Sequence, residues 1–569
     1  MPRPSRALWP LALVAFATSA AAQIDSERAL EPVVIVGEDA APLLGAAPQT
    51  VLAFRWGGAG WEPVPVQVDE RALVDVADAY GPLDPFDCDP FLFCVGLRGA
   101  VETLFWTDTG TFLGPDPDAT LDADDEIALV AGDGGPRAPE ATPPPAGTAP
   151  GTLTEVQLAD EASGATAYVY LAVGDGTGDP AAGADRVRYA FDLLSGDYRE
   201  TYDLAGTNAN GGEPVGDALG SNPESTTVET DRYRLHYSDR WILDGLALGD
   251  GPDLLDRRKV LFNPGDCDRH ETTGSRGEGA FVVNRDGPVR AIRSVIGFNS
   301  GPLTQRTDVF WPGRVVSTTD LRVHAIPGVL DAMDYAPEAT GMLYRASTMG
   351  AEVTVDGEPD GASDSDEPLA WETLRGSAGA IVTRHDAEGA APGLFFEDDA
   401  EGPTTQCTGD GAALATSGPW VSDGVPNSDP RLGAAQSFRA TRTAVLTPEP
   451  LTAPEAQAVL DRLASPLAVT VTSRAVASGE GPAAAGLAVT VWPNPSRGRV
   501  AVRFTLAAPG PVRLSVLDAL GREVTSGART PRAAGAHRLE VDLGGLAPGA
   551  YLVRLETGAG VVARPVTRL

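Results

Sequence analysis

The C-terminal residues 487–569 alternate apolar and polar side chains with a period of two, and this alternation constrains the fold more than any other feature of the chain. Short runs of such alternation are typical of half-buried β-strands. Glycine and proline separate the runs, as at Pro509-Gly510-Pro511 and Gly544-Gly545. Because these residues favour tight turns, the pattern predicts a small antiparallel sandwich of seven short strands.

A motif within this segment resembles the type A C-terminal sorting domain of type IX secretion. The matching positions, in chain order, are Trp492, Pro493, Asn494, Pro495, Gly498, Asp518, Gly521, Arg522, Gly549 and Tyr551. Trp492 stands where the family often has tyrosine, and both side chains are aromatic. A carbohydrate-binding sandwich is the alternative interpretation of this segment.

The resemblance implies a fold and a set of partners. The family has an immunoglobulin-like sandwich without catalytic residues. An outer-membrane translocon reads the domain, and a sortase-like peptidase often removes it. The cargo is then released or attached to surface lipopolysaccharide, so the resemblance implies an extracellular or cell-surface protein.

The first residues of the chain predict export by the Sec route. Residues 1–22 begin with Arg3 and Arg6, continue through a short apolar stretch, and end in Ala20-Ala21-Ala22. This is the pattern of a signal peptide and its cleavage site, and the apolar stretch is too short to span a bilayer. A buried N-terminal helix is the alternative. No other run is long and apolar enough for a membrane span, so we expect the mature chain to pass through the periplasm and across the outer membrane.

The four cysteines suit an oxidising compartment. Cys88 and Cys94 are close enough in sequence to close a short local loop, which leaves Cys267 to pair with Cys407. Metal binding is the alternative, although the chain has neither a C-x-x-C motif nor a nearby pair of histidines. We therefore predict the disulfides Cys88–Cys94 and Cys267–Cys407.

The charge of the chain excludes several classes of function. The 569 residues carry 43 Lys+Arg against 79 Asp+Glu, a formal net charge of −36. Nucleic-acid binding needs a positive face that attracts phosphate, so we expect no nucleic-acid partner. Lys259 is the only lysine and no glycine-rich segment precedes it, which excludes a phosphate-binding G-x-x-x-x-G-K-[ST] loop.

The region before the sorting domain predicts an all-β fold, a large acidic β-sandwich, because it consists mostly of short β-rich runs between Gly, Pro and Asp turns. A helix is expected near 453–464, where Thr452 and Glu455 form a capping box. A long insertion in one large sandwich is the alternative to a division at the Pro-rich segment. The predicted parts are a signal peptide at 1–22, an N-terminal β-rich unit at 23–135, a Pro-rich loop or linker at 136–151, a main β-rich region at 152–472, a linker at 473–486 and the sorting domain at 487–569.

Two acidic segments are candidate metal sites. Hard carboxylate oxygens at alternate positions suit Ca²⁺. The first segment predicts a calcium site that is not an EF-hand, because Leu121 and Ile127 replace the required Gly and Glu. Its candidate ligands are Asp116, Asp118, Asp122, Asp124 and Glu126. The second segment, a candidate metal or catalytic site around Cys407, contains Glu397, Asp398, Asp399 and Asp410. Solvated acidic turns are the alternative for both.

A few aromatic and basic side chains are candidate ligand or catalytic residues. Trp56 and Trp61 flank a glycine-rich turn and either stack on sugar rings or pack under a sheet. Arg234 and His236 are expected on one face of a strand, and His324 lies in a similar run. Such a face would bind a sugar acid and transfer a proton, and a plain polar face is the alternative.

Together these patterns indicate a protein that is secreted or displayed through type IX secretion. We interpret the central region as a binding or structural β module, stabilised by calcium, with a polysaccharide or surface lipopolysaccharide as candidate ligand. The alternative is a carbohydrate-active enzyme, either a polysaccharide lyase or a glycoside hydrolase, on a large β-sandwich.

Overall fold

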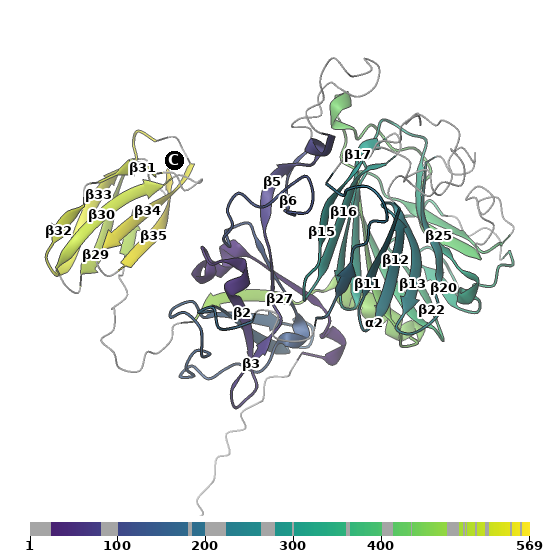
Figure 1. Cartoon of the computed structure of the whole chain (residues 1–569), viewed down its shortest axis with the longest axis horizontal. Coiled ribbons are helices and arrows are strands. Elements are labelled where there is room, and N and C mark those ends of the chain that lie inside the picture. Colours follow the sequence, from purple (N-terminus) through teal and green to yellow (C-terminus); the bar gives the residue numbers. More distant parts are fainter. Residues whose placement is uncertain are drawn as a thin grey trace, which may run out of the picture. The chain divides into compact units, whose positions relative to one another are not determined.

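The computed structural model places the chain in two compact units, Met1–Val476 (the central unit) and Ala477–Leu569 (the C-terminal unit) (Figure 1). It describes residues 24–80, 101–179, 185–199, 223–262, 279–298, 301–359, 365–400, 414–433, 435–474, 489–492, 496, 498–506, 509–517, 523–527, 529–546, 549–557 and 560–568. No helix in these ranges is long and apolar enough to cross a membrane. Strands dominate both units, so the predicted all-β class is confirmed.

The first part of the central unit is built from two small sheets that share one core. Their strand orders are β1-β7-β4 and β27-β8-β9-β2-β3. The strands are β1 Pro32–Val36, β4 Gln67–Asp69, β7 Glu126–Val130, β27 Ala468–Ser473, β8 Thr154–Ala159, β9 Thr166–Val173, β2 Val51–Trp56 and β3 Trp61–Val64, with a separate hairpin of β5 Arg71–Asp75 and β6 Glu102–Trp106. Ile35, Leu129, Val156 and Leu171 are buried between the sheets. Strands β2 and β3, which precede residues 136–151 in the sequence, share the five-stranded sheet with β8, β9 and β27, which follow them. A division of the chain at residues 136–151 stays a prediction.

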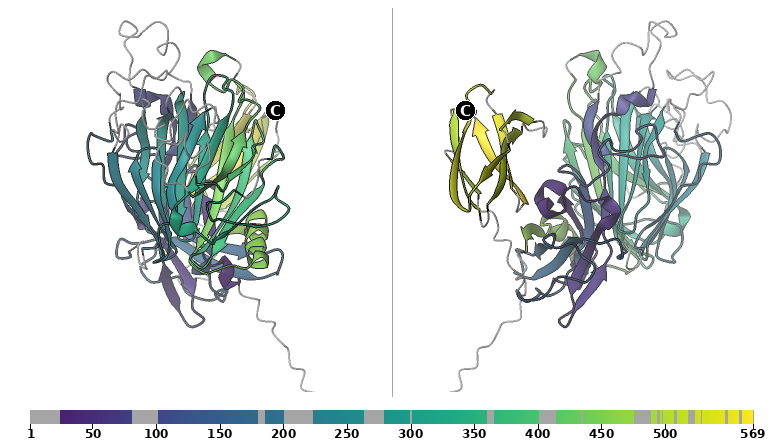
Figure 2. Two further views of the ribbon diagram at one scale, coloured as in Figure 1. Left: turned by 90° about the vertical axis from the view of Figure 1, so that its right-hand side faces the viewer. Right: turned by 60° about the vertical axis from the view of Figure 1, so that its left-hand side comes forward.

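The second part is a large sandwich, seen from two further sides in Figure 2. A nine-stranded sheet has the order β15-β16-β17-β18-β26-β23-β22-β20-β21, and two four-stranded sheets, β14-β19-β25-β24 and β10-β11-β12-β13, share its core. The nine strands are β15 Ala280–Arg285, β16 Ala291–Phe298, β17 Gly301–Trp311, β18 Arg314–Asp320, β26 Arg439–Thr447, β23 Gly379–Glu388, β22 Trp371–Gly376, β20 Leu343–Ala346 and β21 Val353–Thr354. The others are β14 Leu255–Phe262, β19 Val329–Tyr335, β25 Ala415–Val421, β24 Gly393–Glu397, β10 Arg188–Ala190, β11 Pro223–Glu229, β12 Tyr233–Asp239 and β13 Ile242–Leu248.

One α-helix, α2 (Ala453–Ala464), packs on the outside of the nine-stranded sheet. It begins at a capping box, in which the Glu455 carboxylate accepts hydrogen bonds from the Thr452 amide and hydroxyl, both at 2.7 Å. Its apolar stripe of Ala456, Val459 and Leu460 is buried beside Val382 of β23. The helix therefore covers one face of the sheet and leads the chain back to β27.

A layer of charged side chains crosses the interior of the sandwich, between the nine-stranded sheet and the sheet β14-β19-β25-β24. We call this set the ionic layer; its members are Arg258, Arg306, Asp308, Asp331, Glu372, His385 and Arg442. Arg258 of β14 reaches across to β18, where its Nη1 donates to the Ser317 hydroxyl at 3.1 Å. The layer thus binds the two sheets together at fixed register.

Glu372 of β22 sits at one end of this layer. Its Oε1 accepts from Arg442 Nη2 at 2.8 Å and contacts His385 Nε2 at 3.0 Å, while its Oε2 accepts from Tyr344 and Ser417 at 3.0 Å each. Burial alone would raise the pKa of Glu372, but Arg442 and His385 overcome that effect and hold the pKa at about 2. The carboxylate is therefore ionised throughout the physiological range.

The C-terminal unit is a small antiparallel sandwich with sheets β28-β29-β33 and β31-β30-β34-β35. Its strands are β28 Val489–Trp492, β29 Arg499–Leu506, β30 Gly510–Leu517, β31 Glu523–Ser526, β32 Thr530–Arg532, β33 Gly535–Asp542, β34 Gly549–Thr557 and β35 Gly560–Arg568. Val502, Phe504, Val553 and Leu555 form its core. The described residues of the unit form one strand more than the seven predicted, because β31 and β32 pair with the same edge of β30. Strand β31 pairs with the end of β30, and β32 pairs with its start.

Glu372 should make the central unit sensitive to acid. Its pKa lies below the ordinary value of 4.5, so its stabilisation is complete above about pH 4.5 and is lost as the pH falls toward 2. Glu372→Gln should cost about 3–5 kcal/mol at pH 7, because it leaves Arg442 buried without its charge partner. Urea unfolding at pH 7 and pH 3 measures both effects. Glu388→Gln, on the exposed end of β23, should leave stability unchanged, and equal losses in the two variants would contradict the assignment.

The central unit should fold without the C-terminal unit. A mature chain ending at Arg474 keeps β27 paired with β8 and should melt within about 2 °C of the central transition of the full chain. A chain ending at Ser465 loses β27 and the buried Leu467, and should melt several degrees lower. Calorimetry of the three chains checks this expectation. Early melting of the Arg474 chain would show that the two units stabilise each other.

Candidate functional site

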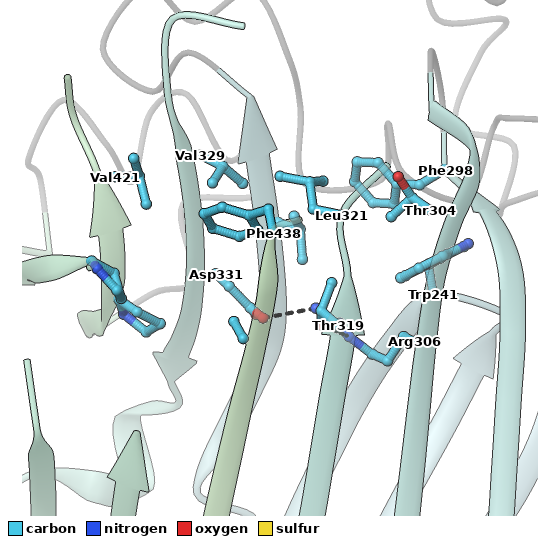
Figure 3. Close-up of a pocket in the computed structure, with 14 residues that line it drawn as sticks. Trp241, Phe298, Thr304, Arg306, Thr319, Leu321, Val329, Asp331, Val421 and Phe438 are labelled. Atoms are coloured by element: carbon cyan, nitrogen blue, oxygen red, sulfur yellow. Dashed lines mark hydrogen bonds and ion pairs between the residues drawn. The ribbon is translucent and has the colours of Figure 1, made fainter. Parts of the chain in front are cut away.

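A small apolar pocket lies at one end of the sandwich, between the nine-stranded sheet and β14-β19-β25-β24. Figure 3 shows its apolar walls, which include Trp241, Phe298 and Phe438, around an ion pair of Arg306 and Asp331. The guanidinium of Arg306 also lies 5.3 Å from the centre of the Trp241 ring. The cavity volume is about 40 Å³, well below the several hundred Å³ typical of ligand sites, so it suits ordered water rather than a sugar.

Asp331 at the base of this pocket is clamped by two arginines. Arg258 donates to both of its oxygens, at 3.0 and 2.9 Å, and Arg306 donates to Oδ2 at 2.8 Å. Burial would raise the pKa of Asp331, but the two guanidinium groups hold it well below its usual range. Asp331 is therefore a structural anion and has no proton to give in catalysis.

A much larger cleft, of about 560 Å³, lies beside α2; we call it the α2 cleft. The short 3₁₀ helix Ser26–Arg28, the start of β18, the end of β26 and α2 form its walls. Apolar side chains line it, among them Leu30, Leu446, Leu451, Val459 and Leu463. The volume lies within the range of sites that bind small organic ligands.

Three arginines reach into the α2 cleft. Arg232 is paired with Glu449, and Arg462 is paired with Glu27. The side chain of Arg314, at the first position of β18, makes no hydrogen bond or ion pair with any residue of the described ranges. Burial lowers the pKa of Arg314, while Glu31 nearby acts in the opposite direction. The cleft therefore presents one guanidinium whose donors are open to a bound anion.

The two candidate tryptophans are used in packing. The Trp56 and Trp61 rings meet edge to face at 5.3 Å, and Trp61 meets Tyr170 at 4.9 Å. The Trp61 indole also donates to the Pro143 carbonyl at 2.7 Å. Both rings are half-buried, and a sugar platform at this place stays a prediction.

The first acidic segment brings three carboxylates together. Ligand oxygens of Asp122, Asp124 and Asp125 lie within 4.8 Å of one another. Asp125 also organises the loop, since it accepts from the amides of Asp122 and Arg71, both at 2.8 Å. Contact with the Asp122 carboxyl raises the pKa of Asp124 to about 6. Two carboxyl groups in contact require a shared proton or a cation between them.

Other candidates in that segment have different surroundings. Asp116 is only 8% exposed, and its Oδ2 is buried without a hydrogen-bond partner. Burial raises the pKa of Asp116, and the negative charges of Asp122 and Asp118 add to the effect. Glu126 is instead held by Arg290 at 2.6 Å and by Arg71 at 2.8 Å. The structure therefore separates Glu126 from the clustered carboxylates and adds Asp125 to them.

The described residues of the second acidic segment do not form a comparable group, and a metal or catalytic site at this segment stays a prediction. Asp398 accepts hydrogen bonds from the amides of Asp356 and Gly357, at 3.0 and 2.7 Å, and so fixes a turn. Within the described ranges, the three-carboxylate group at Asp122 is the one with metal-ligand spacing, and Glu397 and Asp399 are not in it. Asp410 and Cys407 lie outside these ranges.

Several further predictions fall on residues that the structure does not describe. These are the signal peptide, the four cysteines Cys88, Cys94, Cys267 and Cys407, and the sorting-motif residues Pro493, Asn494, Pro495, Asp518, Gly521 and Arg522. Among the described motif residues, Trp492 ends β28, and Tyr551 of β34 packs against the core of the C-terminal unit. The predicted disulfides stay predictions.

The candidate histidines lie on the surface of the sandwich. His324 is exposed in the loop after β18. His236 of β12 contacts Asp244 Oδ1 through Nδ1 at 2.6 Å and Ser225 Oγ through Nε2 at 3.4 Å. Arg234 is exposed two residues earlier on the same strand.

Sequence reasoning missed Arg314, Ser225 and Asp244. No local sequence pattern marks them, because the side chains that surround each of these residues come from other strands, which the sequence near the residue does not specify. Asp125 was not among the candidate ligands, but it lies within the acidic segment, and the run of carboxylates there could have indicated it.

Comparison with solved structures gives matches with low scores. A candidate aldose 1-epimerase from Escherichia coli K12 matches with a TM-score of 0.24 and 11% identity, covering 39% of this chain and 97% of that one. An alpha-mannosidase from Enterococcus faecalis V583 matches with a TM-score of 0.30 and 10% identity, covering 89% of this chain and 54% of that one. At these scores, neither the fold nor the activity of those proteins is carried over.

The C-terminal unit is similar to a known family. A search of curated proteins gives no match to the chain. Residues 490–566, however, match the family model described as a secretion system C-terminal sorting domain. These residues cover most of the C-terminal sandwich, from β28 to β35, and include the motif positions from Trp492 to Tyr551. The chain therefore carries a type IX secretion C-terminal sorting domain at its C-terminus, which directs it to the cell surface or the extracellular space.

Proposed function

We propose that the exported central unit is a binding module for an anionic saccharide, and that the ligand occupies the α2 cleft. The observation that carries this proposal is Arg314, a guanidinium that lines the cleft without a partner among the described residues. A guanidinium presents a planar fork of donors that matches a carboxylate or a phosphate in two parallel hydrogen bonds. The ligand therefore needs an anionic group that reaches the guanidinium of Arg314 when it is bound in the cleft.

The remaining walls of the cleft favour a saccharide as the carrier of that anion. Leu30, Leu451 and Leu463 offer apolar surface, against which the C–H face of a sugar ring can pack. Arg232 and Arg462, with their glutamate partners, offer paired donors and acceptors to hydroxyl groups at the rim. Acidic polysaccharides and phosphorylated lipopolysaccharide sugars share this chemistry.

Binding is favoured over glycoside hydrolysis because two buried carboxylates of the sandwich, Asp331 and Glu372, are held ionised. A glycosidase needs one carboxylic acid with a raised pKa to protonate the leaving group. The pKa values of Asp331 and Glu372 are lowered instead, and arginine occupies oxygens of both carboxylates. No histidine is among the described residues that line the α2 cleft, so a proton-abstracting imidazole is not placed there for a lyase.

Mutation of Arg314 tests the proposal. The purified mature chain should bind uronate-containing or phosphorylated oligosaccharides in preference to neutral ones on a glycan array and by calorimetry. Arg314→Gln should weaken that binding about 10- to 100-fold, the effect of losing charge-assisted hydrogen bonds. Arg188→Gln removes an exposed arginine of β10 outside the cleft and should leave the affinity unchanged.

Other outcomes of the same assay would reject the binding module. Equal affinity of Arg314→Gln and Arg188→Gln for every anionic glycan would place the ligand elsewhere. New reducing ends or unsaturated sugars in the bound samples would favour the alternative, a carbohydrate-active enzyme.

We also propose that the first acidic segment binds Ca²⁺ and thereby stabilises the central unit. Calcium bonds its oxygen ligands at about 2.3–2.6 Å, so oxygens within 4.8 Å of one another are compatible with one ion. The buried, unpartnered oxygen of Asp116 supports a cation in this neighbourhood, because an isolated carboxylate oxygen is costly to bury. Asp122, Asp124 and Asp125 are the proposed ligands.

Thermal unfolding tests the calcium proposal. Millimolar Ca²⁺ should raise the melting temperature of the EDTA-treated chain, since a ligand that binds only the folded state stabilises it by about 2.7 kcal/mol at a hundred times its Kd. Asp122→Asn with Asp124→Asn should abolish the shift. Asp175→Asn, which removes an exposed carboxylate from a turn in the same part of the unit, should preserve it. A shift of equal size in the double variant would reject these ligands.

A further inference from the structure

Three side chains on neighbouring strands of the sheet β10-β11-β12-β13 form a Ser–His–Asp series. His236 of β12 lies between Asp244 of β13, which its Nδ1 contacts at 2.6 Å, and Ser225 of β11, which its Nε2 contacts at 3.4 Å. The order of contacts, carboxylate to Nδ1 and hydroxyl to Nε2, is the order found in acyl-transfer triads. This series lies outside the α2 cleft and does not depend on the function proposed for that cleft.

A β-bulge brings the aspartate to the histidine. His236 pairs with Gly245 and the next residue, Tyr237, pairs with Leu243, so Asp244 is the extra residue of the bulge. In an unbroken ladder Asp244 would point to the opposite face from His236, and the bulge re-aims it. Gly245 makes the approach possible, because a Cβ at that position would lie 3.0 Å from the Cβ of His236.

A second irregularity accompanies the serine. The pairing of β11 with β12 shifts between Pro223 and Thr226, and Ser225 lies inside that shift. The Ser225 amide is held by the Asp192 carbonyl at 2.8 Å, so the backbone that carries the hydroxyl is fixed. Strand β13 thus departs from the regular ladder beside His236, whereas β11 departs from it at Ser225 and pairs regularly with His236 through Thr227.

The series is open to solvent. Ser225 is exposed, and the side chains of His236 and Asp244 are 39% and 22% exposed. A carboxylate on Nδ1 fixes the tautomer in which Nε2 carries a lone pair, and this lone pair faces the serine hydroxyl. The 3.4 Å separation is long for a hydrogen bond and falls in the looser range seen before substrate binds.

We propose that Ser225, His236 and Asp244 form an esterase site that hydrolyses small acyl esters, such as O-acetyl groups, carried on an exposed chain. The Ser225 oxygen forms a bond to the acyl carbon while His236 Nε2 takes the hydroxyl proton. The ester C–O bond breaks, and His236 returns the proton to the departing alcohol. Water then attacks the acyl-serine with the same proton transfers, and the carboxylic acid leaves.

The surroundings of the series indicate the kind of ester. The Ser225 amide donates to Asp192 and is not available to the developing oxyanion. Arg234 is exposed on the same strand, two residues before His236 and on the same face, and is the cation that we assign to the oxyanion. Because the hydroxyl of Ser225 is exposed on a sheet face, it can reach an acyl group that projects from a large alcohol, and we expect slow turnover.

The test uses p-nitrophenyl acetate and a fluorophosphonate probe on the full mature chain. The wild type should hydrolyse the ester above the buffer rate and carry the probe on Ser225, located by peptide mass spectrometry. Ser225→Ala and His236→Asn should each lower the protein-dependent rate at least about 10-fold and abolish labelling, and Asp244→Asn should lower the rate in the same direction. Ser422→Ala should change neither readout. It removes an exposed serine whose hydroxyl donates to an aspartate, Asp366, and not to a histidine.

Because the Ser225 side chain is exposed and those of His236 and Asp244 are partly exposed, the variants should keep the wild-type melting temperature, which separates loss of activity from loss of fold. Labelling of a different serine would overturn the proposal. So would a wild-type hydrolysis rate equal to that of Ser225→Ala.

Discussion

The sandwich depends on the ionic layer between its sheets. Two apolar sheet faces can slide over each other by a residue pair with little change in buried area, but a layer of paired charges is satisfied in one register only. Arg258 illustrates this constraint, because the same guanidinium bonds Asp331 of the neighbouring strand β19 and Ser317 of the opposite sheet. Burying these ions is costly, so each must keep its partner.

The same layer restricts where chemistry can occur. Asp331 and Glu372 are the carboxylates that a glycosidase hypothesis would select first, since they are buried near a pocket and beside histidine or arginine. Their arginine partners hold them ionised, which suits them for structure and removes them from proton transfer. Binding and catalysis are therefore assigned to groups outside the layer, namely Arg314 in the α2 cleft and the exposed series at His236.

Several parts of the fold were predictable because their signals are local. The helix at 453–464 has its capping box and apolar stripe within one short segment, and the strands of the C-terminal unit have alternation and turn residues. The count of seven strands was wrong because β31 and β32 divide one edge of β30 between them, and that division depends on pairing. The candidate His236 was found from its strand face, whereas Ser225 and Asp244 were not.

The sequence by itself determined the all-β class and the export address, because periodicity, turn residues and the sorting motif are properties of neighbouring positions. The tertiary structure alone decided which charges meet. Arg314 has no side-chain partner among the described residues, Asp331 has two arginines, and Asp244 turns toward His236, and the reasons lie in strand register and in a single bulge. Register is set by contacts between segments far apart in the chain, and no local pattern of residue types specifies it.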